Sequence, residues 1–174
     1  MLSHNHLLRF QTLPTSLLDE TAKPGPARGP ILSLDLGARR VGVAVSDPSL
    51  IAITRLSALH RSNWKQLLRD VDDLIRRFDA QTLVIGFPLN LDGTEGRAAT
   101  ETRQIAQKFA RSLELPVYLQ DERLTSREAE ERLRTSGYRS SELAAHVDGE
   151  SAAIILEDFI GNGQHTMRVL RQLD

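Results

Sequence analysis

The chain has 174 residues, a net charge of −1 and 40% hydrophobic residues, a composition typical of an ordinary globular protein. It contains no cysteine, which excludes disulfides, thiolate zinc sites and cysteine nucleophiles. No apolar run approaches the ~20 residues of a membrane helix or forms a signal peptide, so we expect a cytoplasmic protein without a membrane partner. The charge provides no overall basic field for nucleic acid, but nearly all the cations are arginines, whose planar fork suits phosphate.

The N-terminal region reads as an extension of the main domain. Residues 1–29 show no sustained periodicity and lead into the stretch KPGPARGP. Proline removes backbone donors and glycine adds conformational freedom, so this stretch is typical of a linker. We expect a flexible extension over 1–29, a domain over 30–162 and a C-terminal tail over 163–174.

The domain is expected to open with an antiparallel hairpin. Residues 31–36 and 41–45 are apolar runs separated by the short turn 37–40, and a third strand is predicted over 51–57. Apolar residues then recur every three or four positions over 62–78, which predicts an amphipathic helix.

The rest of the domain alternates strands with helices. The expected elements are a strand over 82–85, a helix over 96–113, a strand over 117–119, a helix over 125–133 and a helix from about 148 to 160. The short β-branched run after the first helix suits a parallel strand buried on both faces. Thr125 and Glu128 form a capping-box pattern. This order indicates a mixed α/β fold, with a five-stranded sheet and helices on both faces.

Asp35 lies inside an otherwise apolar strand. Alternation would put Ser33 and Asp35 on one face and the neighbouring leucines on the other. The next strand adds small side chains, at Gly42 and Ala44, to one of its faces. If the two faces coincide, Asp35 stands in a shallow open site with room for an ion or a phosphate. The alternative is a local role, in which Asp35 hydrogen-bonds the backbone of the adjoining turn.

Two further acidic positions lie at the ends of expected elements. Asp121, Glu122 and Arg123 follow a parallel strand, at the edge where ligands gather in open α/β sheets, although a solvated connector also explains them. Asp148 is expected at the N-terminal tip of the last helix, in line with its apolar stripe, where an N-cap role is the alternative.

Three carboxylates on separate elements could therefore converge on the sheet. Unpaired, they would repel one another and raise at least one pKa, and a divalent cation would remove that penalty. Oxygen ligands without cysteine or clustered histidine favour Mg²⁺ or Mn²⁺ over zinc. The chemistry that suits such a site is phosphoryl transfer, with two ions roughly 4 Å apart.

Four blocks of sequence resemble one family. Residues 35–47 (DLGARRVGVAVSD) match the pattern D-x-G-x-[KR]-R-[IV]-G-[VL]-A-x-[SC]-D that opens the YqgF/RuvX family of pre-16S rRNA nucleases, relatives of the RuvC Holliday junction resolvases. The other blocks follow in order, at 84–95 (VIGFPLNLDGTE), 121–126 (DERLTS) and 147–156 (VDGESAAIIL). The likeness spans about residues 31–160. It departs at Phe87, where leucine is commoner, and in an N-terminus longer than the family's usual start.

The resemblance implies an RNase H-like fold and a metal-dependent nuclease. It places the catalytic and metal-binding carboxylates at Asp35, Glu122 and Asp148. The residues expected to contact nucleic acid are Arg39, Arg40, Asn90, Arg97 and Arg123. As a group they would hold phosphates without reading bases, although a salt bridge to a nearby acid explains any single arginine equally well.

The leading hypothesis is a nuclease that trims the 5′ end of a small-subunit rRNA precursor. The first alternative is a junction resolvase on branched DNA, which should be a homodimer with two sites across one junction. A second is a nucleotide-binding module, because Asp-x-Gly on a first hairpin also opens the phosphate loop of actin- and hexokinase-like ATPases. A third is a ribosome-assembly factor that binds without cutting.

Overall fold

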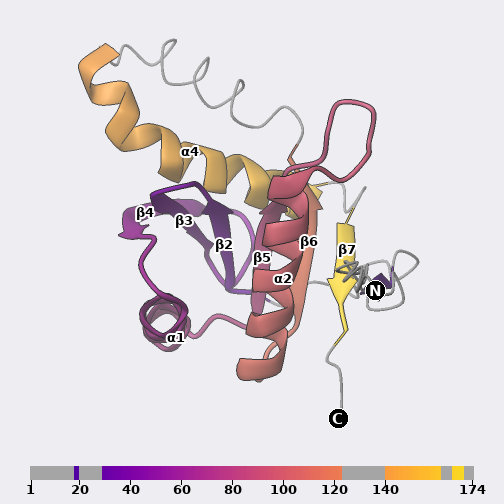
Figure 1. The fold of residues 1–174 in the computed structure, drawn as a ribbon. Helices are drawn as coiled ribbons and strands as arrows, with labels where there is room; N and C mark the ends of the chain where they lie inside the picture. The colour runs from indigo at the N-terminus through magenta and orange to yellow at the C-terminus, as the bar shows by residue number, and fades with distance from the viewer. Residues whose placement is uncertain (1–17, 20–28, 123–139, 162–165, 171–174) are drawn as a thin grey trace, which may run out of the picture.

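A mixed sheet lies between two layers of helices in the computed structural model, which describes residues 18–19, 29–122, 140–161 and 166–170 (Figure 1). The strands are β1 (Leu18–Asp19), β2 (Ile31–Leu36), β3 (Arg40–Ser46), β4 (Ile53–His60), β5 (Thr82–Phe87), β6 (Val117–Asp121) and β7 (Thr166–Val169). The helices are α1 (Trp64–Phe78), α2 (Arg97–Ser112) and α4 (Ser140–Gly161). The helix expected over 125–133 lies outside the described residues. No helix within these ranges is long and apolar enough to cross a membrane.

The sheet has the strand order β1-β7-β6-β5-β2-β3-β4. β2, β3 and β4 form an antiparallel meander, whereas β2, β5 and β6 are parallel. All five expected strands are present, but the expected strand number is wrong because β7 and the two-residue β1 extend the sheet to seven. β7 lies within the segment 163–174 that was expected to be a tail. β7 has only four residues, two of them with polar side chains, so its own sequence carries little strand signal. The strand is stabilised by its pairing with β6, which is distant in the sequence.

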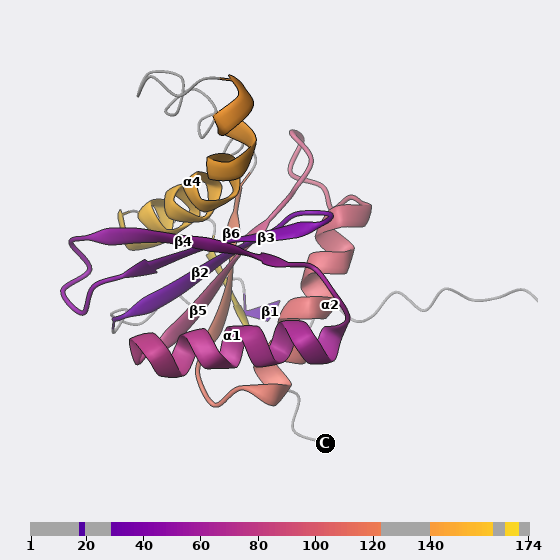
Figure 2. The same cartoon turned by 90° about the vertical axis from the view of Figure 1, so that its left-hand side faces the viewer.

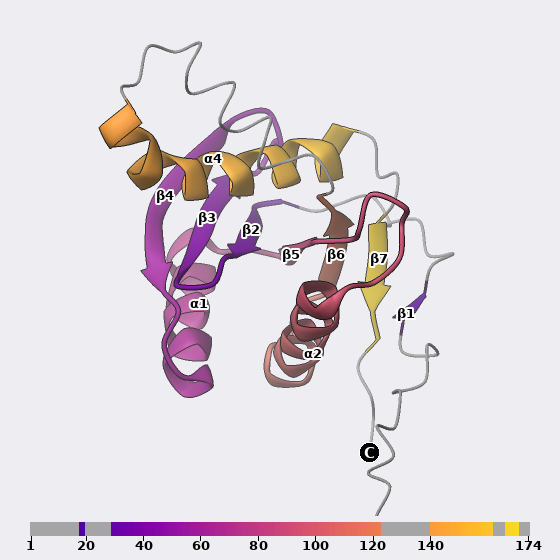
Figure 3. The ribbon, with the colours of Figure 1, turned by 45° about the horizontal axis from the view of Figure 1, so that its top comes forward.

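The two faces of the sheet are covered by different helices, as expected (Figures 2 and 3). Leu32 and Leu34 of β2 belong to the larger core, which is shared with α1 and α2. Ile31, on the opposite face of the same strand, belongs to a smaller core with Ala152 and Ile155 of α4. The alternation read from the sequence is therefore confirmed, and the face that carries Asp35 is the one that α4 covers.

The first helix begins and ends at recognisable capping residues. The Asn63 side chain accepts a hydrogen bond from the Gln66 backbone N–H at 3.1 Å, so α1 begins at Trp64, two positions later than expected. The helix ends at Phe78 because Asp79 adopts a left-handed conformation, with φ of 51°. Trp64 packs edge-on against Phe109 of α2, with ring centroids 4.9 Å apart, which joins the two helices of this layer.

The last helix begins earlier than the sequence pattern predicts. α4 starts at Ser140, so the expectation that Asp148 opens the helix is wrong, and Asp148 lies in its interior. Gly149 suggests a boundary at this point, but a glycine inside a helix costs only about 1 kcal/mol relative to alanine. Packing of the following turns against the sheet offsets that cost, since Ala152 and Ile155 are both fully buried.

Candidate active site

Asp35 projects from the centre of the sheet toward α4. Its cross-strand partner is Gly42, and Ser33 is paired with Ala44, so the small side chains of β3 share its face. Because Gly42 has no side chain, the surface beside Asp35 is open to the helix above. The two faces therefore coincide, as the expectation required, but α4 lies over them, so the site is covered and not open.

Asp148 reaches this site because α4 packs directly on the β3 backbone. A Cβ atom added at Gly42 would lie 1.9 Å from the Asp148 carbonyl oxygen, so only glycine allows this approach. The contact holds Asp148 over the residue paired with Asp35. The carboxylate therefore enters the site from a helix interior, where it has no capping role.

Glu122 approaches from the other side of β2. It directly follows β6, and its backbone N–H donates to the Phe87 carbonyl at 3.2 Å. Its carboxylate lies over Gly86, where an added Cβ would be 2.1 Å from Oε2. Gly86 is one step beyond the last recorded β2–β5 pair, Leu34 with Ile85, which makes it the lateral neighbour of Asp35. Gly86 thus clears space for the Glu122 carboxylate, and Gly42 for the α4 backbone at Asp148.

The electrostatics of these groups reflect burial and mutual repulsion. Burial, followed by the charge of Asp148, raises the pKa of Asp35 to about 6, and the Ser151 hydroxyl partly offsets this rise. Burial, followed by the charges of Asp35 and Asp121, raises the pKa of Glu122 to about 8. The site therefore contains more negative charge than its surroundings neutralise.

Among the described residues, Arg40 brings a positive charge to this cluster. Arg40 Nε lies 2.8 Å from Asp148 Oδ2, and the Arg40 side chain is 42% exposed. Asp148 Oδ2 is nevertheless buried and accepts no well-aligned hydrogen bond among the described residues. The contact is thus an ion pair without the directed hydrogen bonds that fix a guanidinium on a carboxylate.

The donor set fits a divalent cation in its chemistry. It offers carboxylate oxygens, which Mg²⁺ and Mn²⁺ prefer, and the raised pKa values of Asp35 and Glu122 indicate charge that a cation would neutralise. Within the part of the chain that the structure describes, no three acidic or histidine side chains are close enough to enclose an ion by themselves. Binding would therefore require the carboxylates to draw together around the ion.

A second ion pair next to the site was not expected from the sequence. Glu150, two residues after Asp148, is buried, and both of its oxygens engage Arg55 of β4 in a bidentate pair. This pair attaches α4 to β4. The sequence distinguishes poorly between Asp148 and Glu150, because only the packing shows that Glu150 already has a basic partner.

The residues expected to bind nucleic acid occupy three places. Arg39 is exposed in the β2–β3 turn, beside Arg40. Arg97 is exposed at the first position of α2. Arg123 lies outside the described residues. The structure thus brings Arg40 to the carboxylates and leaves Arg39 and Arg97 at the surface.

Asn90 belongs to a loop that is stabilised by its own internal hydrogen bonds. Its Nδ2 donates to Thr94 Oγ1 at 2.9 Å, and its backbone N–H donates to the Thr94 carbonyl at 2.9 Å. Thr94 is also bonded to Asp92, which lowers the pKa of that carboxyl group. Asn90 therefore shapes the loop that connects β5 to α2, and this loop projects beyond the end of the sheet (Figure 2).

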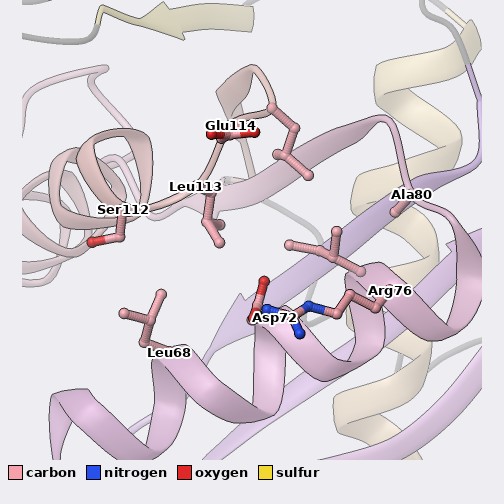
Figure 4. A pocket seen from close by; sticks show the side chains of 9 residues that line it. Leu68, Asp72, Arg76, Ala80, Ser112, Leu113 and Glu114 are labelled. Carbon is pink, nitrogen blue, oxygen red and sulfur yellow. Dashed lines mark hydrogen bonds and ion pairs between the residues drawn. The ribbon is translucent and has the colours of Figure 1, made fainter.

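Two other features lie away from the carboxylates. Asp47, the last residue of the first sequence block, accepts hydrogen bonds from the backbone N–H groups of Ser49, Ile51 and Ala52, so it stabilises a turn. A cavity of about 540 Å³ lies between α1 and α2, under the opposite face of the sheet (Figure 4). Its lining includes Leu68, Asp72, Arg76, Ala80, Ser112 and Leu113. None of the three carboxylates borders it.

Comparison with known proteins shows a family likeness over most of the chain. A family profile described as RuvX, Holliday junction resolvase, matches residues 29–162. A protein of Anaeromyxobacter sp. (strain Fw109-5), named "Putative pre-16S rRNA nuclease", is 40% identical over 134 residues, or 77% of this chain and 97% of its own length. A protein of the same name from Rhodopseudomonas palustris (strain BisB5) is 39% identical over 144 residues, or 83% of this chain and 90% of its own length.

A solved structure identifies the fold. The RuvC structure of Thermus thermophilus superposes with a TM-score of 0.50 at 13% identity and covers 79% of this chain and 98% of that one. At this identity the likeness concerns the fold alone, and that fold is RNase H-like, as the sequence resemblance implies. With a family match over most of its length and relatives near 40% identity, the chain belongs to the RuvX family and is a nuclease.

Proposed function

We propose that this nuclease depends on a divalent cation, Mg²⁺ or Mn²⁺, and uses Asp35, Glu122 and Asp148 as its catalytic carboxylates. The observation that carries the proposal is their convergence on one face of the sheet, where Gly42 admits the backbone at Asp148 and Gly86 admits the Glu122 carboxylate. The cation would neutralise charge at the scissile phosphate and activate the attacking water.

The chain's own residues would prepare this reaction. Asp35 is central, because it interacts electrostatically with both Asp148 and Glu122. In the hydrolysis, water would attack phosphorus and the bond to the 3′ oxygen would break. The three carboxylates would hold the cation, which would supply a positive charge to the reaction. Arg39, Arg40, Asn90, Arg97 and Arg123 would bind the flanking phosphates, either directly or by shaping the loop that does so.

The substrate that we propose is the 5′ region of precursor 16S rRNA, in the cytoplasm. Its support is the shared name of the relatives near 40% identity. The second candidate is a four-way DNA junction, supported by the description of the matching family. That activity would call for a homodimer, with one active site on each side of the junction.

The test compares cleavage of precursor 16S rRNA and of a four-way DNA junction in Mg²⁺, Mn²⁺ or EDTA. Asp35→Asn should lower cleavage by at least about 100-fold without lowering the melting temperature, because it removes the central ligand and also a buried charge. Asp73→Asn is the matched control, since Asp73 is exposed on α1, on the other side of the sheet. Full activity of the Asp35 variant, or undiminished activity in EDTA, would refute the proposal.

A further inference from the structure

The two ion pairs that link α4 to the meander differ in how firmly they are held. Arg55 engages Glu150 through two nitrogens and two oxygens, and the Glu150 side chain is only 6% exposed. Arg40 meets Asp148 through a short contact, but Asp148 Oδ2 accepts no aligned hydrogen bond among the described residues. The first pair has the geometry of a permanent attachment and the second that of an exchangeable one.

We infer that Arg40 is an internal counter-ion that occupies Asp148 until a divalent cation replaces it. This inference rests on the proposed function, because it assumes that Asp148 is a ligand. Arg40 supplies positive charge to the carboxylate cluster in the absence of metal. A divalent ion that uses Asp148 must therefore displace the guanidinium, and Arg40 competes with the metal.

The position of Arg40 allows such an exchange. The residue is the first of β3 and directly follows the hairpin turn, and its side chain is 42% exposed, so water can solvate the guanidinium once it leaves Asp148. Because the guanidinium is already partly solvated in the pair, its release into water has a low cost. The released guanidinium remains at the rim of the site, where the phosphate backbone would approach.

The consequence is that removal of Arg40 should strengthen metal binding. We expect Arg40→Gln to bind Mn²⁺ about two- to fivefold more tightly than the wild type, from the usual strength of an ion pair with a solvated cation. Arg40→Lys keeps the charge and should remain near the wild type. Arg39→Gln, at the exposed neighbouring position, makes the same change in net charge and should alter the affinity less.

The experiment titrates Mn²⁺ into the full chain without nucleic acid and follows free Mn²⁺ by electron paramagnetic resonance. Melting curves in EDTA verify that each variant is folded. In an Asp148→Asn background, the Arg40→Gln substitution should no longer affect the affinity, because its partner is gone.

The outcomes separate this inference from the proposed function. If the wild type binds Mn²⁺ and Arg40→Gln binds no more tightly than Arg39→Gln, the counter-ion role is refuted while the metal requirement stands. If the gain persists in the Asp148→Asn background, Arg40 acts through another group and the inference is again refuted. If the wild type shows no saturable Mn²⁺ binding, the metal requirement fails and the inference fails with it.

Discussion

At the scale of single residues, the site is governed by carboxylates that are buried next to one another. Asp35 and Glu122 have pKa values of about 6 and about 8 in the folded protein, against ordinary values of 3.8 and 4.5. Their protonated forms are therefore favoured by folding. In the absence of metal, the two carboxyl groups do not destabilise the fold below about pH 4, where both are largely protonated in the folded and the unfolded chain. The destabilisation grows above that pH and is complete above about pH 8, where both are ionised in the folded protein too.

This dependence can be measured by melting the protein in EDTA at pH 5 and pH 9. Glu122→Gln removes one of the two charges, so it should raise the melting temperature at pH 9 by about 5 °C and change it little at pH 5. The exposed Asp73→Asn variant should follow the wild-type profile. Parallel curves for Glu122→Gln and the wild type would contradict the raised pKa of Glu122.

Gly86 offers a second test at this scale. An alanine Cβ at this position would lie 2.1 Å from Glu122 Oε2 and 2.6 Å from Ile155 Cδ1, so both side chains must move. Gly86→Ala should lower cleavage by roughly tenfold or more through displacement of Glu122, with a smaller effect on substrate binding. Gly161→Ala is the control, since nothing lies within 4 Å of its added Cβ. Activity equal to that of the control would show that the position of Glu122 is unimportant.

At the scale of elements, the site depends on where α4 lies on the meander. Gly42 lets the helix touch β3, and the Arg55–Glu150 pair attaches it to β4. Arg55→Ala leaves the buried Glu150 carboxylate without that partner, so it should destabilise the fold by about 1–3 kcal/mol and lower activity. Chemical denaturation measures the first effect and a cleavage assay the second.

The control for this pair lies on α1. Arg76 and Asp72 form an exposed pair one helical turn apart, and Arg76→Ala should cost less than about 1 kcal/mol. Equal losses for Arg55→Ala and Arg76→Ala would mean that the buried pair does not hold α4 in place.

The same elements show what a sequence can predict. The alternation around Asp35 and the recurrence of apolar residues every three or four positions in α1 are local patterns. From them the sequence predicts β2 and α1 correctly. The start of α4 was missed because Asp148 was interpreted as its opening residue, whereas the helix continues through Gly149 and packs on the sheet. Arg40 was assigned to nucleic acid from the sequence, and only the structure shows its contact with Asp148. The roles of Asp35, Glu122 and Asp148 in catalysis remain predictions.

At the scale of the whole molecule, β7 completes the sheet beside β6. Its pairing spans Val117 with Val169 through Gln120 with Thr166, and the hydroxyl of Thr166 donates to the Gln120 side chain. Deletion of residues 163–174 would remove this strand and expose the β6 edge, whose free backbone groups favour aggregation.

We therefore expect the deletion to lower the melting temperature by more than about 5 °C and to cause light scattering on heating. Deletion of 171–174 alone leaves β7 in place and should leave both measurements unchanged. A stable, monodisperse protein lacking 163–174 would mean that β7 is dispensable.

The cavity between α1 and α2 has a practical consequence. The natural chain contains no cysteine, so a single thiol introduced at Ser112 would be unique. Ser112 is exposed at the cavity wall, with the sheet between it and the carboxylates. A fluorophore attached to this thiol would report substrate binding, and a linker attached to it would immobilise the enzyme on a solid support. In both cases the face that carries the carboxylates stays accessible to substrate.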